Sequence, residues 1–320
     1  MTKPRVYVAT SIYAAALLLF WLVSHHSQPA SELGHRFPFA FISFALLLAP
    51  LWFFAFGAGD CIRGRLQTPS KRISASALLG VPYLVFALPS GEFRWLMIVI
   101  FAIPVVLSAV LQFFAASPKA SIADDVVLSA LAAIYMLHLL SPAWPYASLS
   151  PLPKLFVADV ALYLCVVVRN LSRMGYAFAQ PGGAFLIGLR EWLYFLPFGL
   201  GLGFALAFIH FHAHQPTGPD LFIAVVVTFF LIALPEELFF RGIIQNLLET
   251  RLGRTAALVL ASILFGLAHF NKGADFNWRY VLLASIAGVF YGRAWRARHQ
   301  LLASVITHTA VDVVWSLWFR

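Results

Sequence analysis

Ionisable side chains stand inside apolar stretches in the last third of this 320-residue chain. They form three groups: Glu236, Glu237 and Arg241 in the first, His269 in the second, and His308 and Asp312 in the third. A carboxylate in a site of low dielectric constant is a stronger base toward water, and an imidazole beside it can share or return the proton. Donors aimed at a carbonyl oxygen stabilise a tetrahedral intermediate. The residue types therefore predict hydrolytic chemistry in a polar cavity that water can reach.

Helical spacing gives each group a geometry. Glu237 and Arg241 are four residues apart, so they can form an ion pair along one helix face, and we interpret this pair as structural. His308 and Asp312 have the same separation and share a face, where the carboxylate can orient the imidazole ring. Glu236 is rotated about 100° from its neighbour. One glutamate can therefore be held by the arginine while Glu236 remains available for chemistry.

Depth along the helices brings the three groups to one level. The segment from Arg251 to Arg254 contains a glycine and is predicted to be the turn of a helical hairpin. Glu236 lies fifteen residues before that segment and His269 fifteen residues after it, so each sits roughly 22 Å from the turn. The last helix, predicted to begin near residue 299, places the third group roughly 14 to 20 Å along its axis. Three helices thus present acid, base and hydrogen-bonding groups in one layer.

The helices that carry these groups are predicted to span a membrane. Hydrophobic residues make up 61% of the chain and charged residues 11%, whereas a soluble domain has about 25% charged residues. The expected fold class is therefore all-α, a polytopic integral membrane helical bundle of about nine to eleven transmembrane helices in the lipid bilayer. Eleven apolar stretches lie near residues 6–24, 38–58, 73–89, 94–115, 122–140, 154–170, 192–212, 220–241, 255–271, 278–295 and 300–319.

The basic residues predict the orientation of the chain. The formal net charge is +9, but Lys and Arg flank apolar stretches instead of forming a basic patch, so nucleic-acid binding is not expected. With a cytoplasmic N-terminus and an uncleaved first span, fifteen Lys and Arg fall in inner segments and six in outer ones, as the positive-inside rule requires. We predict a multi-pass protein of the cell membrane. Residues 1–190 are interpreted as an N-terminal accessory transmembrane region and residues 191–320 as the catalytic core.

The three groups, in this order, resemble the motifs of the type II CAAX prenyl endopeptidase and bacteriocin-processing (CPBP) family of intramembrane proteases. The resemblance covers about residues 190–320. It implies that Glu236, assisted by His269, activates water, and that His308 and Asp312 stabilise the oxyanion. Glu237 and Arg241 match the acidic and basic pair that accompanies the base in this family. The substrate expected from the resemblance is a membrane-associated or lipidated protein or peptide, and neither its identity nor an oligomeric state follows from the sequence.

Two features leave alternatives open. Many relatives have Asn where this chain has Asp312, and an ionised Asp would repel an oxyanion, so Asp312 must be protonated, pair with His308 or serve another purpose.

Carboxylate and imidazole also suit Zn²⁺, with Glu236, His269 and His308 as ligands, although the HExxH pattern of zincins is absent. We favour metal-independent catalysis without a cofactor. The competing functions are a transporter or proton relay, and a non-catalytic scaffold or immunity protein.

Overall fold

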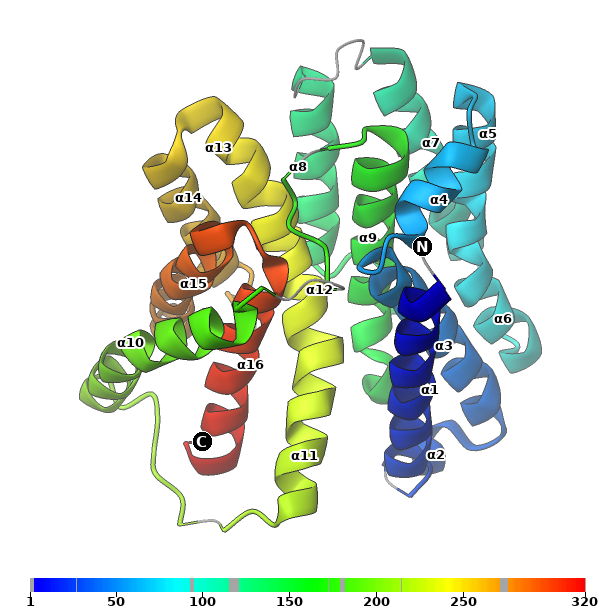
Figure 1. Ribbon diagram of the computed structural model, residues 1–320. Coiled ribbons are helices and arrows are strands. Elements are labelled where there is room, and N and C mark those ends of the chain that lie inside the picture. Colours follow the sequence, from blue (N-terminus) through cyan, green and yellow to red (C-terminus); the bar gives the residue numbers. More distant parts are fainter. Residues whose placement is uncertain are drawn as a thin grey trace. The chain divides into compact units, whose positions relative to one another are not determined.

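The computed structural model describes residues 3–26, 28–92, 95–114, 121–171, 173–178, 182–213, 215–270 and 276–319. Helices make up the regular structure of these residues, and their one β feature is an isolated antiparallel bridge between Phe211 and Phe319 (Figure 1). The predicted all-α class is confirmed.

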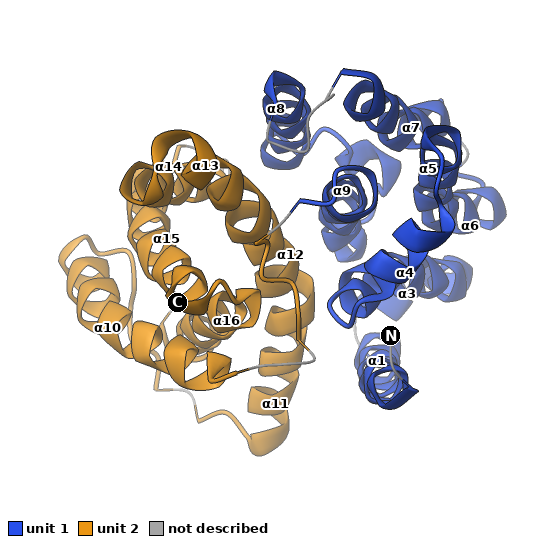
Figure 2. Cartoon of the chain, turned by 45° about the horizontal axis from the view of Figure 1, so that its top comes forward, with its two compact units in different colours: residues 1–172 blue, residues 173–320 orange. Residues whose placement is uncertain are grey.

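The chain folds into two compact units, residues 1–172 and residues 173–320, which Figure 2 shows in blue and orange. All the candidate residues of the three groups lie in the second unit. The predicted division at residues 190/191 separates an accessory region from a catalytic one. It concerns role rather than compactness, and it stays a prediction.

Helices of the first unit pack around α9, whose residues are nearly all buried. A helix that is apolar on all sides belongs inside a bundle, and α9 contacts both α3 and α8. In the described residues the α-helices of this unit are α1 (Lys3–His25), α2 (Gln28–Leu33), α3 (Phe37–Phe54), α4 (Ala58–Arg65), α5 (Pro69–Ser76), α6 (Val81–Ser90), α7 (Leu96–Phe114), α8 (Ile122–Met136) and α9 (Pro151–Tyr163).

The second unit carries the first group of candidate residues on α12 and η7, the second in the turn after α14, and the third on α16. Its α-helices in the described residues are α10 (Ala184–Ala205), α11 (Gly218–Val227), α12 (Leu234–Glu237), α13 (Asn246–Leu252), α14 (Arg254–Leu267), α15 (Trp278–Arg298) and α16 (Leu301–Trp318). The π-helical segments η6 (Thr228–Ala233) and η7 (Leu238–Gln245) join α11, α12 and α13 into one helical stretch, Gly218–Leu252.

Pro235 explains the irregular backbone at the first group. Proline has no N–H to donate, and inside a regular α-helix its ring collides with the carbonyl four residues earlier. The chain accommodates Pro235 in the short turn α12, between the wider turns of η6 and η7. Such π turns are rare and occur often at functional sites. Glu236 and Glu237 follow directly and so project from this irregular part of the helix.

The predicted hairpin between the first two groups is confirmed. α13 ends at Leu252 and α14 begins at Arg254, with Gly253 at a φ of +78° between them. Arg241 and Phe265 are each twelve residues from Gly253, and the Arg241 guanidinium carbon lies 4.8 Å from the centre of the Phe265 ring. The two helical arms of the hairpin therefore lie side by side at the level of Arg241 and Phe265. This level is one helical turn away from Glu237 and from His269.

Small residues let α14 and α15 approach closely. A Cβ atom on Gly266 would lie 1.9 Å from the Ser285 hydroxyl oxygen and 2.5 Å from the Val281 carbonyl oxygen. A Cβ on Gly288 would lie 3.1 Å from the Cα of Ser262. The backbones occupy the space that larger side chains would need, which brings the aromatic face of α15 against the end of α14.

Eight helical stretches in the described residues are long and apolar enough to cross a membrane, which supports a multi-pass membrane protein. They correspond to eight of the eleven predicted spans. The other three fall on α8, α14 and α15. α8 and α14 have only 15 and 14 residues, and α15, with 21 residues, ends in a run rich in arginine.

Candidate active site

Glu237 is the centre of a buried network between the first and third groups. Its side chain is fully buried, and its Oε1 accepts a hydrogen bond from His308 Nδ1 at 2.8 Å. Its Oε2 accepts a hydrogen bond from the Ser304 hydroxyl and lies 3.2 Å from Arg241 Nε. An ionised carboxylate only accepts hydrogen bonds, so His308 carries its proton on Nδ1. Glu237 thereby ties α12 to α16 and sets the orientation of the imidazole.

His308 is held on its remaining sides by residues of α14, α15 and α16. Its Nε2 faces Asp312 Oδ2 at 3.4 Å, one helical turn further along α16. The ring stacks on Tyr291, with centroids 4.6 Å apart and planes inclined by 15°, and it meets Phe265 edge-on at 5.5 Å. A separation of 3.4 Å is long for a hydrogen bond, so the contact with Asp312 is the weaker of the two that the ring makes. The predicted neighbourhood of His308 and Asp312 is present.

Arg241 lies fully buried beneath this network. Its guanidinium carbon is 4.8 Å from the Phe265 ring centre and 5.7 Å from that of Tyr291, distances at which a cation is attracted to a ring face. Within the described residues its nitrogens make no hydrogen bond of good geometry. The charge of Glu237 and the two aromatic faces therefore compensate the desolvation of the guanidinium, as the predicted ion pair requires.

His269 follows the last turn of α14 and is nearly buried. Its Nδ1 lies 2.9 Å from the carbonyl oxygen of Phe265, an acceptor, so Nδ1 carries the proton and Nε2 is left with a lone pair. The ring centre lies 4.8 Å from that of Tyr280 on α15. This tautomer suits a base or a proton shuttle.

Glu236 lies one position before Glu237 and is 4% exposed. It interacts electrostatically with the Tyr280 hydroxyl and with the Arg241 guanidinium. Asp312 also interacts with that hydroxyl. Glu236 and Asp312, from different helices, thus both interact with one tyrosine.

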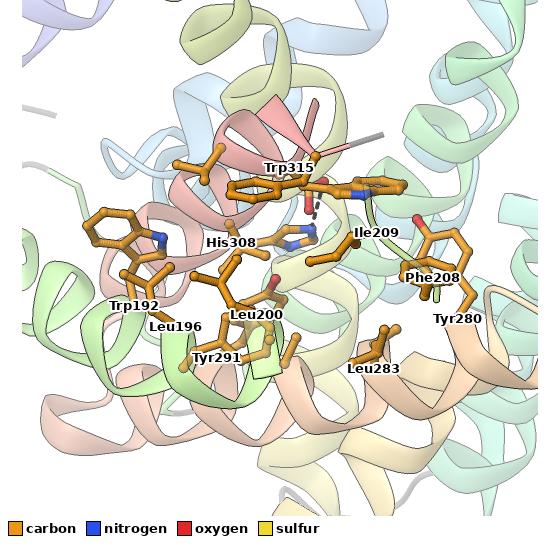
Figure 3. Close-up of a pocket in the computed structure, with 18 of the residues that line it drawn as sticks. Trp192, Leu196, Leu200, Phe208, Ile209, Tyr280, Leu283, Tyr291, His308 and Trp315 are labelled. Carbon is orange, nitrogen blue, oxygen red and sulfur yellow. Dashed lines mark ion pairs between the residues drawn. The ribbon is translucent and has the colours of Figure 1, made fainter. Parts of the chain in front are cut away.

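A cavity of about 100 Å³ within the second unit is lined by side chains of the second and third groups (Figure 3). A cavity needs only about 10–15 Å³ of such volume to hold a water molecule, so this one has room for several. Its walls are mostly apolar. The polar side chains among its lining are those of His269, Tyr280, Tyr291, His308 and Asp312. The second and third groups therefore share one cavity, whereas Glu236 is not part of its lining and interacts electrostatically with Tyr280, which is.

The zinc alternative gains no support from this arrangement. His308 directs one nitrogen at Glu237 and the other at Asp312, so neither points toward a common site with Glu236 and His269. In the part of the chain that the structure describes, no three His, Cys, Asp or Glu side chains are placed to hold a metal ion.

Three polar residues of the site were missed by the sequence analysis. Ser304 lies four residues before His308 and so shares its helix face, a signal that the spacing already contained. Tyr280 and Tyr291 are eleven residues apart, close to three full turns, and therefore lie on one face of α15. Tyrosines at the ends of apolar stretches are common as interface anchors, which masked their role here.

Comparisons with curated proteins and with solved structures gave no match. The family model that matches covers residues 218–314, from the start of α11 into α16, and contains all six candidate residues of the three groups. Its description is Type II CAAX prenyl endopeptidase Rce1-like, a protease family. The resemblance noted from the three motifs is thus confirmed for residues 218–314, which match the Rce1-like type II CAAX prenyl endopeptidases.

Proposed function

We propose that this chain is an intramembrane endopeptidase that hydrolyses a peptide bond of a membrane-associated or lipidated protein. One observation carries the proposal. Side chains from α14, α15 and α16 line a single cavity with room for water and for apolar groups, and a buried carboxylate network orients one of its histidines. The match of residues 218–314 to a protease family points the same way.

In the proposed mechanism Glu236 is the general base. It takes a proton from water as the water oxygen bonds to the carbonyl carbon, while the carbonyl π electrons move to the oxygen. His269, through Nε2, shares this proton and helps to return it. The proton passes to the amide nitrogen as the C–N bond breaks, which releases a carboxylic acid and an amine. Glu237 fixes the orientation of the His308 ring. We place the oxyanion on the side of the cavity where this ring lies.

Cleavage of native substrates tests the proposal. We expect protein termini that appear in membranes from cells expressing the wild-type chain to be lost with both Glu236→Ala and His269→Ala, because each change removes a group that moves the proton. The measurement is mass-spectrometric mapping of protein termini in equal amounts of membrane. Wild-type termini that persist in both variants would defeat the protease assignment and favour a transporter or a scaffold.

We further propose that the activity needs no metal ion. The guanidinium of Arg241, 3.2 Å from Glu237, supplies the positive charge that a cation would bring to this carboxylate. The purified protein is expected to keep its rate after prolonged treatment with EDTA and 1,10-phenanthroline, measured on a peptide that spans a cleavage site found in cells. Loss of activity on chelation that Zn²⁺ restores would establish the metal-dependent alternative.

The substrate class is proposed from the family name. A peptide ending in a farnesylated CAAX motif, compared with the same peptide lacking the farnesyl group, is the first synthetic probe. The apolar walls of the cavity, among them Trp192, Leu196 and Trp315, suit an apolar side chain or lipid on either peptide.

We propose residence in the cell membrane with a cytoplasmic N-terminus, and residues 1–190 as an accessory region.

A further inference from the structure

We propose that Tyr280 is a further catalytic residue, whose phenolic hydroxyl donates a hydrogen bond to the carbonyl oxygen of the scissile peptide bond. The inference rests on the proposed function and concerns the same cavity. It assigns the oxyanion donor to a residue outside the three motif groups.

The donors expected in the third group are already engaged. His308 donates from Nδ1 to Glu237 at 2.8 Å, and its Nε2 faces Asp312 at 3.4 Å. Asp312, when ionised, has no proton to donate and would repel a developing negative charge. A neutral donor from another helix can interact with the oxyanion without that repulsion.

Tyr280 lines the cavity, lies in ring contact with His269 and is close enough to two carboxylates to interact with both. Its hydroxyl interacts electrostatically with both Asp312 and Glu236, the proposed base, and its side chain lines the cavity. Tyr291, the other tyrosine of the lining, has its ring stacked flat on His308 and interacts with Asp312, Glu237 and Arg241. Of the two phenols, Tyr280 is the one in ring contact with His269, and its hydroxyl interacts with the proposed base, where we place the attacked carbonyl.

The ring of Tyr280 is held before any substrate binds. Its backbone N–H donates to the Asn277 side chain at 3.1 Å, where α15 begins. Ring centres of His269, Phe208 and Trp315 lie at 4.8, 5.4 and 5.6 Å from its own. Figure 3 shows Tyr280 beside Phe208 at one end of the cavity. A donor fixed in this way needs little reorganisation as charge develops on the oxygen, which is the condition for strong electrostatic catalysis.

The chemistry of the step is balanced without a further reactant. As the water oxygen bonds to the carbonyl carbon, the carbonyl π pair becomes the lone pair of an oxyanion, and Glu236 holds the proton from water. The Tyr280 O–H remains covalently bonded and stabilises the oxyanion by hydrogen bonding. When the C–N bond breaks, the lone pair reforms the carbonyl and the amine takes the proton from Glu236. Tyr280 ends as it began.

Kinetics of Tyr280→Phe test the inference. We expect kcat to fall about 10²–10³-fold with little change in KM, because the lost hydrogen bond forms mainly in the transition state. The probe is a synthetic peptide that spans a cleavage site found in cells, assayed with the full chain in lipid nanodiscs. The same peptide with a phosphonate in place of the scissile amide mimics the tetrahedral intermediate. Tyr280→Phe is expected to weaken its binding by a similar factor, which a purely structural role of the ring would not do.

Tyr194→Phe is the matched control. Tyr194 lies on α10, half exposed and outside the cavity lining, and the variant keeps the ring that faces Arg293. It should retain the wild-type kcat. A Tyr280→Phe enzyme with wild-type kcat, or a comparable loss only in Tyr291→Phe, would overturn the role of Tyr280 while cleavage still depends on Glu236 and His269. If cleavage depends on neither of those residues, the protease proposal itself has failed.

Discussion

Glu236→Gln is expected to lower kcat by about 10²–10⁴-fold while the protein remains folded. Glutamine has the shape of glutamate and fits the same 4% exposed position, but its amide cannot take a proton from water. The measurement is steady-state hydrolysis by the purified chain, with the melting temperature recorded for the same preparation. A variant that keeps the wild-type kcat would remove Glu236 from the mechanism.

Glu237→Gln is the matched comparison, because the two glutamates are adjacent on the same turn. Its carboxylate accepts from His308 and Ser304 and faces Arg241, so the amide leaves a buried guanidinium without its counter-charge. This variant is expected to lose both activity and stability. A melting temperature lowered by Glu237→Gln and unchanged by Glu236→Gln would separate the orienting glutamate from the base.

Contacts within one helix were predictable from the sequence. The four-residue separations of Glu237 from Arg241 and of His308 from Asp312 both appear as side-chain contacts, at 3.2 and 3.4 Å. The hairpin register followed equally directly, because the rise per residue is constant and the turn at Gly253 was recognisable. Helical geometry alone decides these contacts and this register, so they can be predicted without knowing how the helices pack.

Contacts between helices were predicted only in part. The layer shared by His269 and His308 was expected, but the strongest partner of His308 is Glu237, 71 residues away, which was assigned to the arginine alone. Which side chains meet depends on the rotation of each helix about its axis. That rotation is set here by the close packing at Gly266 and Gly288 and by the irregular turns around the proline, and the polarity of the sequence carries little trace of either.

The number of spans shows where hydropathy is informative. Long apolar helices such as α1, α3 and α7 were recognised because lipid requires about twenty apolar residues to cover the backbone. α14, with 14 residues, and α15, which ends in arginines, do not meet the length and composition expected of a span in lipid. Both pack against other helices of the second unit, and hydropathy does not register such contacts.

Arg241→Met is expected to destabilise the protein by about 3–5 kcal/mol, because it leaves Glu237 as a buried carboxylate without its counter-ion. Methionine keeps an unbranched apolar stem against Phe265, so the loss reflects charge more than volume. Arg241→Lys restores the charge but not the planar group that stacks between Phe265 and Tyr291, and it should recover only part of the stability. The free energy of unfolding in detergent micelles measures all three proteins.

The double variant Arg241→Met with Glu237→Gln identifies the cause of the loss. If an uncompensated carboxylate destabilises the single variant, neutralising Glu237 should return part of the lost free energy, so the two changes will not add. Additive losses would instead assign the effect to packing around the aromatic rings. Activity should stay low in the double variant even where stability returns, because the amide no longer orients His308 as the carboxylate does. Stability and catalysis then separate at Glu237, whose charge both holds the arginine and sets the imidazole.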